Sequence, residues 1–397
     1  MTEVGRDSGV DGGRRLRVWA LEPYFGGSHK AHLDGLKRYS GHDFTLLTLP
    51  GRFWKWRMHG GALSLARRVD QAVASTAQAH PQVLFVSDML DLPVFLAAGG
   101  PGLARVPAIL YFHENQLTYP LPPGVGRDLD YGFRNLTSAL VAQRVLFNSE
   151  YHRREFFAAA ADLLQAMPDE VPLWVLDDVA AKAGVLHVGC DLRRLDRHRS
   201  RALSDAAAGR WGDPSAGPLL LWNARWEYDK APGDLFEALY ALKASGAGFR
   251  LAMAGPNQGT PTAEFLRASV ELRDRIVQWG KVAESSDYAS LLWASDVVVS
   301  TAIHEFFGVA AVEAMYCGCR PVLPRRLSYP ELVPAEAHGD VLYGEGELVT
   351  ALARALAAPR AWPEDRQRAW VSRFDWAHLI DRYDEEIQRC WQSATPA

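Results

Sequence analysis

Short apolar segments alternate with longer amphipathic ones along the first half of the chain. Each apolar segment ends at a polar residue or a turn, which predicts a buried strand. The segments between them place apolar residues at helical spacing. This alternation predicts an α/β fold with a doubly wound, mostly parallel sheet. The predicted strands are 16–22, 44–49, 83–87, 108–112, 144–148 and 185–188, and the predicted helices are 28–39, 62–79, 134–142 and 149–166.

The alternation stops at about 193–218 and then starts again. The interrupting stretch is rich in Arg, Ala, Ser, Gly and Pro and has little apolar periodicity, so we interpret 196–217 as a linker. A long amphipathic segment ends the chain. In the second half the predicted strands are 219–223, 249–254, 276–279, 297–301 and 320–323, and the predicted helices are 232–245, 262–273, 287–294, 309–317 and 376–393.

Length and charge agree with two globular domains. A chain of 397 residues is too long for one ordinary core. We therefore expect a disordered N-terminus at 1–14, a first domain at 15–195, a second at 218–375 and a final helical segment at 376–397. The net charge of −4 argues against wholesale coating by nucleic acid and leaves room for a local basic patch.

Targeting signals and disulfides are not indicated by the sequence. No apolar run approaches the roughly 18 residues that span a bilayer, and the N-terminus lacks the apolar core of a signal peptide. We therefore expect a cytoplasmic protein that does not engage a membrane. The four cysteines are too few and too scattered for a disulfide framework, and Cys317 and Cys319 are expected to be buried thiols.

Two α/β halves predict a ligand cleft between them, because open α/β sheets bind ligands at the carboxyl ends of their strands. The first strand is not followed by Gly-x-Gly-x-x-Gly, and the chain has no Gly-Lys-Ser/Thr phosphate loop. A dinucleotide fold or a P-loop is therefore disfavoured.

Two carboxylates flank the start of the predicted helix at 309–317. Glu305 lies in the preceding loop and can accept hydrogen bonds from sugar hydroxyls, while Glu313 lies one turn inside and can accept them from a ribose diol. Free amides and the helix dipole favour an anion between them. Taken alone, the two glutamates are also explained as a helix cap and a solvated helix residue. The donor-binding residues predicted in this segment are Glu305, Phe306, Phe307, Gly308, Val309 and Glu313.

This segment resembles the donor-site signature of the large retaining glycosyltransferase family that includes sucrose synthases and phosphatidylinositol mannosyltransferases. The signature is Glu, seven residues, Glu, here Glu305 and Glu313 with Gly308 between them. The resemblance implies the GT-B fold, in which two Rossmann-like domains with parallel sheets face a central cleft and the last helix crosses back onto the first domain. It also implies transfer of a hexose from a nucleotide-diphosphate sugar.

A pair of cations follows the first strand of the second half. Arg225 and Lys230 lie five residues apart in the loop after 219–223, where they can stabilise the charge left on a departing diphosphate. The family resemblance implies the same role for this Arg and this Lys. On the residues alone, a surface Arg and Lys are an equally good explanation.

A glycine-rich loop follows the first strand of the first half. Gly26 and Gly27 allow a backbone to approach the donor closely, Ser28 can cap the next helix, and we place Ser28 and His29 at the acceptor. A plain tight turn explains the glycines equally well.

Another strand of the first half ends in a run of polar residues, His113-Glu114-Asn115-Gln116. Burying that many polar groups needs partners, which favours a position in the cleft. We assign Asn115 and Gln116 to the acceptor. The resemblance places His113 beside the transferred sugar, so that His113 and Glu305 are the predicted catalytic residues.

Cations and aromatics interleave at 52–57. This composition is typical of a surface that stacks unpaired bases and neutralises phosphates, and Arg67, Arg68, Arg153 and Arg154 can extend it. The alternative is a loop anchored to the core by its tryptophans. The acceptor-binding residues predicted here are Arg52, Trp54, Lys55, Trp56 and Arg57, with Phe53 between them.

Asp128-Leu129-Asp130 matches the Asp-x-Asp metal motif of the other glycosyltransferase fold. The motif is short, and here it lies in a Pro/Gly-rich loop rather than directly after a strand. We therefore favour solvated loop carboxylates over metal ligands.

The first half also resembles a narrower family, the tRNA-queuosine alpha-mannosyltransferases. The matching phrases are 22–30, 49–57, 111–120 and 147–149, and they follow one another within about 16–190. The resemblance implies that mannose passes from GDP-mannose to queuosine in a tRNA anticodon. It implies no metal, no other cofactor and no stable protein partner. A lipid or small-molecule acceptor, or a non-catalytic tRNA-binding protein, are the alternatives.

Overall fold

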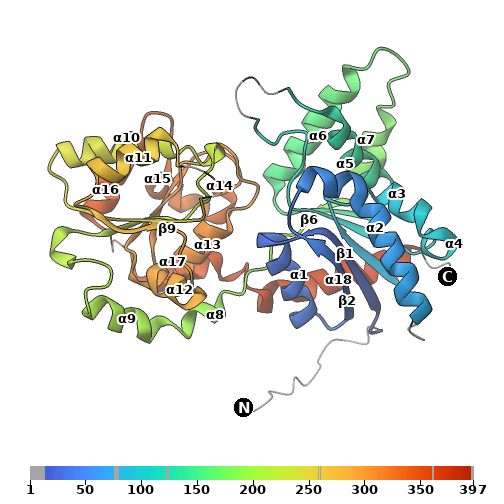
Figure 1. Cartoon of the computed structure of the whole chain (residues 1–397), viewed down its shortest axis with the longest axis horizontal. Helices are drawn as coiled ribbons and strands as arrows, with labels where there is room; N and C mark the ends of the chain where they lie inside the picture. Colours follow the sequence, from blue (N-terminus) through green and yellow to red (C-terminus); the bar gives the residue numbers. More distant parts are fainter. Residues whose placement is uncertain are drawn as a thin grey trace.

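The computed structural model describes residues 14–75, 80–121, 124, 126–257, 259, 261–359 and 362–394. Within these residues the chain forms two α/β domains, each built on a parallel sheet of six strands (Figure 1). The strand orders are β2-β1-β3-β4-β5-β6 and β12-β11-β10-β7-β8-β9. The predicted disordered N-terminus, 1–14, lies outside the described residues except for its last position.

The central strands are short and apolar because helices cover both faces of each sheet. Every residue of β3, β4, β7 and β8 is buried. The strands are β1 (Arg17–Phe25), β2 (Asp43–Pro50), β3 (Val83–Ser87), β4 (Ala108–Phe112), β5 (Arg144–Phe147), β6 (Ala183–Val185), β7 (Leu219–Trp222), β8 (Arg250–Ala254), β9 (Ile276–Gly280), β10 (Val297–Val299), β11 (Arg320–Pro324) and β12 (Leu342–Tyr343).

Some helices of the first domain begin at a residue whose side chain accepts a hydrogen bond from a free backbone amide. Ser149, for example, accepts a hydrogen bond from the His152 amide at 3.0 Å and so caps α6. The helices up to residue 196 are α1 (Gly27–Tyr39), α2 (Trp54–Ser75), α3 (Leu92–Ala98), α4 (Gly100–Leu103), α5 (Leu129–Val141), α6 (Glu150–Gln165), α7 (Trp174–Ala180) and α8 (Arg193–Asp196).

The second domain contains several short helices that apolar periodicity does not predict. A helix of four or five residues has too few positions to show a period, and packing against the rest of the fold stabilises it. The helices are α9 (Arg199–Ala207), η1 (Pro214–Ala216), η2 (Tyr228–Lys230), α10 (Pro232–Ala244), α11 (Ala263–Glu271), α12 (Ser285–Ala294), α13 (Val309–Tyr316), α14 (Tyr329–Leu332), η3 (Ala335–Ala337), α15 (His338–Val341), α16 (Leu348–Ala357), α17 (Glu364–Ser372) and α18 (Trp376–Ala394).

The stretch predicted as a linker, 196–217, contains α9, which lies against α12 of the second domain. Ion pairs hold the two helices together: Arg201 and Arg210 both bind Asp205 and Asp287. Because charged groups make these contacts, the apolar pattern does not reveal the helix.

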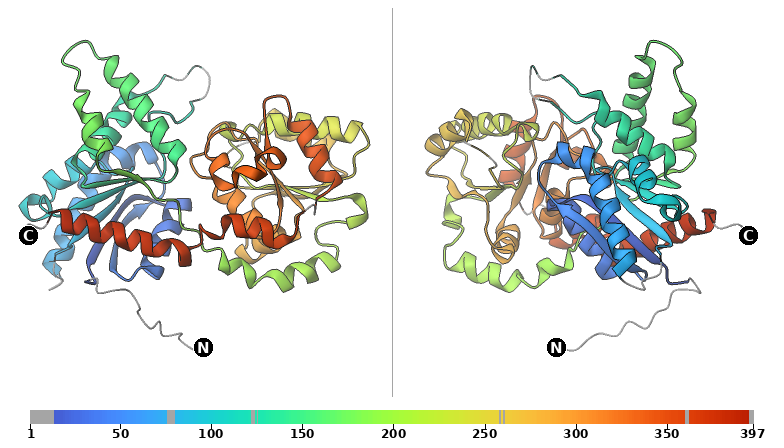
Figure 2. Two further views of the ribbon diagram at one scale, coloured as in Figure 1. Left: turned by 180° about the vertical axis from the view of Figure 1, so that it is seen from behind. Right: turned by 45° about the vertical axis from the view of Figure 1, so that its right-hand side comes forward.

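The last helix, α18, crosses from the second domain and runs along the first (Figure 2). Trp376 at its start is 1% exposed, and its indole lies between the backbones of Gly35 on α1 and Gly189 after β6. One core cluster therefore continues from the first domain through α18 into the second.

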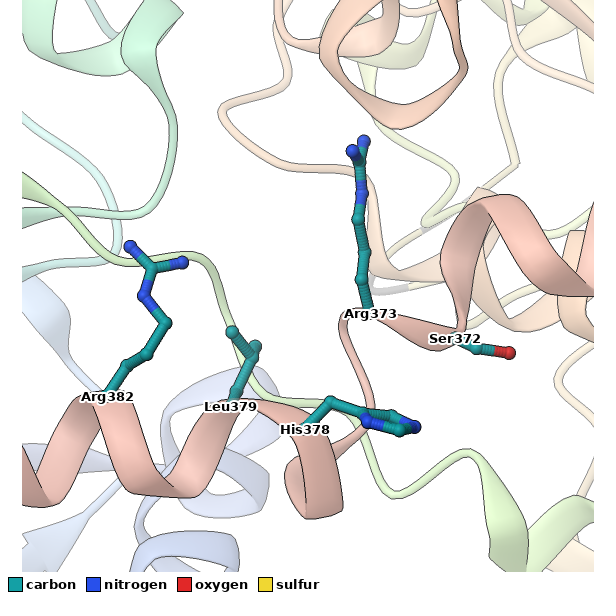
Figure 3. Close-up of a pocket in the computed structure, with 5 residues that line it drawn as sticks. All are labelled: Ser372, Arg373, His378, Leu379 and Arg382. Atoms are coloured by element: carbon teal, nitrogen blue, oxygen red, sulfur yellow. The ribbon is translucent and has the colours of Figure 1, made fainter.

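A cavity of about 400 Å³ lies at the turn between α17 and α18 (Figure 3). Two arginines on one side of this turn each bind a backbone carbonyl: Arg373 donates to Glu331 O at 2.6 Å, and Arg382 donates to Val185 O at 3.3 Å. The first carbonyl belongs to the second domain and the second to the first domain. The crossing is therefore fixed to both domains.

Among the described residues, no helix combines the length and apolarity needed to cross a bilayer. All four cysteines are free and buried, as expected for Cys317 and Cys319.

Candidate active site

Two helix N-termini, one from each domain, lie beside the same cavity of about 290 Å³. Ser28 on α1 lines it from the first domain, and Val309 and Glu313 on α13 line it from the second. Neither helix has a side-chain cap at its first turn. The free amides and the positive ends of both helix dipoles favour an anion between the domains.

Two glycines shape these helix starts. Gly27 has a φ of 53° and Gly308 a φ of 100°, in the left-handed region that glycine adopts most readily. Gly26 packs closely on Gly51, since a Cβ on Gly51 would lie 2.9 Å from the Gly26 Cα. The 52–57 segment therefore starts directly beside the glycine-rich loop.

Glu313 is held from two sides. Arg194 of α8, between the two domains, forms an ion pair with Glu313 Oε1, and the Tyr288 hydroxyl donates to Glu313 Oε2 at 3.1 Å. Asn223 donates to the same hydroxyl at 3.1 Å. The carboxylate predicted to bind a ribose diol is thus fixed in orientation and only 13% exposed.

Lys230 and Glu305 lie next to each other. Lys230 Nζ donates to His304 O at 2.8 Å and lies 3.3 Å from Glu305 Oε2 and 3.0 Å from Asp229 Oδ2. Burial lowers the pKa of Lys230, but Glu305 and Asp229 outweigh it and raise the pKa above its ordinary value. The buried ammonium therefore stays charged and is available to a diphosphate.

Arg225 lies in the same loop and reaches across the domain boundary. Its guanidinium forms an ion pair with Glu227 at 3.2 Å and donates a hydrogen bond to the hydroxyl of Tyr119 in the first domain. The Tyr119 ring also packs on His304, with ring centroids 4.6 Å apart. Burial of Tyr119, with Glu114 and Asp229 nearby, raises its pKa to about 12, so the phenol is neutral.

Phe306 and Phe307 have buried side chains, 4% and 3% exposed. Phe306 stacks on His152 of the first domain at 3.8 Å, and Phe307 packs edge-on against Phe374. Their side chains join the domains, so a donor can meet only the backbone of these two residues. The predicted donor contacts of Phe306 and Phe307 therefore remain a prediction for their backbone groups alone.

His113 ends β4 on the first-domain side of the site. Its amide donates to Asp88 Oδ1 at 2.8 Å, and its ring packs against the His29 ring at a tilt of 37°, with ring centroids 4.2 Å apart. Burial, followed by the charge of His29, lowers the pKa of His113 well below the ordinary imidazole value. A neutral His113 can donate or accept a hydrogen bond with a sugar hydroxyl.

Asn115 and Gln116 organise the loop after β4. Asn115 is fully buried, and its Oδ1 accepts the amides of Leu117 and Thr118 at 3.0 Å each. Gln116 is 8% exposed and donates to Glu114 Oε1 at 3.1 Å. The buried Nδ2 of Asn115 has no hydrogen-bond partner among the residues that the structure describes. That atom is the part of the pair left for the acceptor contact we predict.

The 52–57 segment runs into α2, which begins at Trp54, so that only Arg52 and Phe53 lie before the helix. Phe53 is 71% exposed and Trp56 is 62% exposed, so neither anchors the segment to the core. Trp54 is 37% exposed and packs at 5.3 Å on Tyr131. Among the cations of the segment, Arg52 and Lys55 are exposed, and Arg57 is half-buried and donates to Pro50 O at 3.2 Å. The segment therefore presents aromatic faces and cations together.

Asp128 and Asp130 have structural roles. Asp128 caps α5 by accepting the Asp130 amide at 3.1 Å, and Asp130 pairs with Arg134 at 2.9 Å. In the part of the chain that the structure describes, no three His, Cys, Asp or Glu side chains are arranged to hold a metal. The two aspartates therefore lie at the start of α5, where the sequence predicts a loop.

The structure adds residues that sequence reasoning missed: Glu22, Asp88 and Glu114 around His29, and Arg194 and Tyr288 on Glu313. Glu22 and Asp88 could have been noticed as charged residues in or directly after predicted strands. Arg194 carries no such signal, since it lies in an Arg-rich stretch.

Two family models match the chain. A model described as tRNA-queuosine alpha-mannosyltransferase N-terminal matches residues 17–190, and one described as glycosyl transferases group 1 matches residues 217–358. The chain is 32% identical over 373 residues to a tRNA-queuosine alpha-mannosyltransferase of Drosophila melanogaster, covering 92% of this chain and 95% of that protein. It is 29% identical over 182 residues to a GDP-mannose:cellobiosyl-diphosphopolyprenol alpha-mannosyltransferase of Xanthomonas campestris, covering 44% of this chain and 48% of that protein.

Solved glycosyltransferase structures have the same fold. A crystal structure of Anabaena HepE in complex with UDP-glucose is similar with a TM-score of 0.66 at 19% identity, covering 94% of this chain and 100% of that one. The predicted GT-B architecture of two facing parallel sheets is confirmed.

Proposed function

Because the chain belongs to the tRNA-queuosine alpha-mannosyltransferase family of glycosyltransferases, we propose that it transfers mannose from GDP-mannose to queuosine in a tRNA anticodon. One observation carries the proposal beyond the family. The exposed aromatic and basic segment at 52–57 begins beside Gly26 of the glycine-rich loop, two residues before Ser28, which lines the anion cavity. A single-stranded RNA loop stacked on that segment would hold its modified base next to the donor.

On the donor side, the diphosphate lies between the first turns of α1 and α13, with Lys230 and Arg225 beside it. Glu313 takes the ribose hydroxyls and Glu305 the sugar hydroxyls. The two cations and the helix amides stabilise the charge that appears on the diphosphate as the sugar leaves.

On the acceptor side, His113 positions the sugar, while Ser28 and the 52–57 segment hold the acceptor nucleoside. The acceptor hydroxyl attacks the face from which the diphosphate leaves, and a donor phosphate oxygen takes its proton. The product keeps the alpha configuration. We place this activity in the cytoplasm, where its tRNA substrate is found.

The test is incubation of the protein with queuosine-containing tRNA and a panel of nucleotide sugars, followed by nucleoside mass spectrometry. We expect a hexosylated queuosine with GDP-mannose. Lys230→Ala and Glu305→Ala should each lower the rate by roughly 10²–10³-fold. Lys243→Ala and Glu237→Ala, which remove a half-buried lysine and an exposed glutamate on α10, are matched controls and should leave it unchanged. Near-normal transfer by both site variants would contradict the assignment.

A further inference from the structure

Glu22 is a buried carboxylate at the end of β1, 1% exposed. Its Oε1 accepts the Tyr24 amide at 2.7 Å, and its Oε2 lies 2.9 Å from His29 Nδ1. A carboxylate is stable in such a place only when a positive group and hydrogen bonds compensate its lost hydration. His29 is the cationic partner that the geometry provides.

His29 lies in the first turn of α1 and is 6% exposed. The titratable groups around it are Glu22 from β1, Asp88 after β3, His113 and Glu114 after β4, and His32 one turn along α1. Burial lowers the pKa of His29, but the charge and hydrogen bond of Glu22, then Asp88 and Glu114, outweigh it and raise the pKa to about 9.

The neighbouring histidines are affected in the opposite direction. Burial and the positive charge of His29 lower the pKa of His32 to about 3 and that of His113 well below its ordinary value. The cluster therefore holds one imidazolium among neutral rings. An imidazolium has both nitrogens protonated, so it donates hydrogen bonds and cannot serve as a general base.

We propose that Glu22 and His29 form a dyad in which Glu22 fixes His29 as an imidazolium and His29 Nε2 donates to a phosphate oxygen of the nucleotide-sugar donor. Glu22 binds Nδ1, and among the described residues no hydrogen bond engages Nε2, which leaves this nitrogen to donate to a ligand. His29 belongs to the helix turn whose Ser28 lines the anion cavity. The inference rests on the proposed function, and it makes His29 a donor contact where we had predicted an acceptor contact.

The charge distribution explains why a phosphate is the ligand. Lys230 and Arg225 belong to the second domain, and their charges act on Glu114, as the charge of His29 does from the first domain. A dianionic leaving group between the domains needs compensation from both sides. His29 supplies that charge from the first domain. In this arrangement His29 is a catalytic residue, and Glu22 is a positioning residue that acts through it.

The experiment measures two things between pH 7 and 8.5: the affinity for GDP by calorimetry, and the charge of His29 by NMR of ¹⁵N-labelled histidine. In the native protein we expect a charged His29 and tight GDP binding throughout. In Glu22→Gln we expect a neutral His29 and GDP affinity weaker by about tenfold or more, the usual effect of losing one charge-assisted hydrogen bond. His29→Gln identifies the NMR signal, and Glu385→Gln on α18 is the control for losing a carboxylate.

Guanosine separates a phosphate contact from a general disturbance, because its affinity should be the same in the native protein and in Glu22→Gln. A neutral His29 in the native protein, or equal GDP affinity in the native protein and Glu22→Gln, overturns the dyad. If Glu22→Gln does not fold, the native protein still decides: an NMR titration of His29 extended above pH 9 should show that GDP raises its pKa, and an unchanged pKa overturns the proposal. Failure of the native protein to bind GDP at any pH contradicts the donor assignment itself.

Discussion

Gly35→Ala should detach the C-terminal helix from the first domain. A Cβ at Gly35 would lie 2.2 Å from the Trp376 indole, whereas ordinary contact begins near 3.4 Å. The ring would have to move by the difference, 3.4 − 2.2, or about 1.2 Å. It has no room to do so, because its other face lies against Gly189, where an added Cβ would be 2.4 Å away.

The sign of the effect distinguishes packing from helix propensity. In an open helical site, alanine is more stable than glycine by about 0.8–1.0 kcal/mol. Here the methyl group displaces a tryptophan that is 1% exposed, and losing such a ring costs about 3–5 kcal/mol. The net expectation is a destabilisation of roughly 2–4 kcal/mol. At about 2–4 °C per kcal/mol for domains of this size, Tm should fall by roughly 5–15 °C.

Thermal unfolding followed by circular dichroism measures the change. Gly339→Ala is the matched control, since Gly339 is an exposed glycine of α15 with nothing within 4 Å of its Cβ position, and it should keep or raise Tm. In a Trp376→Leu background, Gly35→Ala should cost much less, because the smaller side chain leaves space for the methyl group. A Gly35→Ala protein that melts at or above the native Tm would refute the reasoning.

Three further changes test other contacts. The pKa of His32 is lowered to about 3, so below pH 6.5 the unfolded state binds a proton that the folded state does not, and the protein loses stability as the pH falls. Urea unfolding at pH 7 and pH 5 should show that His32→Leu loses about 2 kcal/mol less stability between these pH values than the native protein does. An equal loss of stability in both proteins contradicts this. Trp56→Ala should weaken tRNA binding, measured by fluorescence anisotropy, by roughly 1–3 kcal/mol without changing Tm. The control Leu63→Ala, at a similarly exposed site on α2, should change neither the tRNA affinity nor Tm. Equal tRNA affinity in the native and Trp56→Ala proteins excludes stacking of a base on Trp56. The Glu331 carboxylate accepts hydrogen bonds from the first two amides of α6 across the domain boundary, at 2.9 Å and 2.6 Å. Glu331→Gln should therefore lower the free energy of unfolding by about 1 kcal/mol, measured by calorimetry. An unchanged Tm means that this cap adds no stability.

The sheet framework could be predicted because buried parallel strands and covering helices leave strong periodic patterns. The strands at 83–87 and 108–112 are observed with the predicted bounds, since each is an uninterrupted buried segment. The helix α9 could not be predicted, because Arg201 and Arg210 hold it through ion pairs. Sequence periodicity records apolar contacts and is silent on such pairs.

The candidate site divides in the same way. Glu305 and Glu313 flank the start of α13, where local spacing fixes their arrangement, whereas Lys230 meets Glu305 from 75 residues away along the chain. Glu22 and His29 meet only because β1 and α1 turn back on each other at the glycine-rich loop. Arg194 reaches Glu313 from 119 residues away along the chain. No short motif encodes a contact of that length.

The proposed catalytic arrangement depends on how the domains sit, since its cations come from both. Lys230 and Arg225 belong to the second domain, while the proposed cation His29 belongs to the first, beside the neutral His113. Stacking of Phe306 on His152, at 3.8 Å, joins the domains directly beside Glu305. A small shift at this stack would change the separation of the two sets of charges, and electrostatic stabilisation of a leaving group requires those charges to be in place before it forms. Residues that never touch a substrate, such as Phe306 and Trp376, should therefore affect the rate of transfer through the position of the domains.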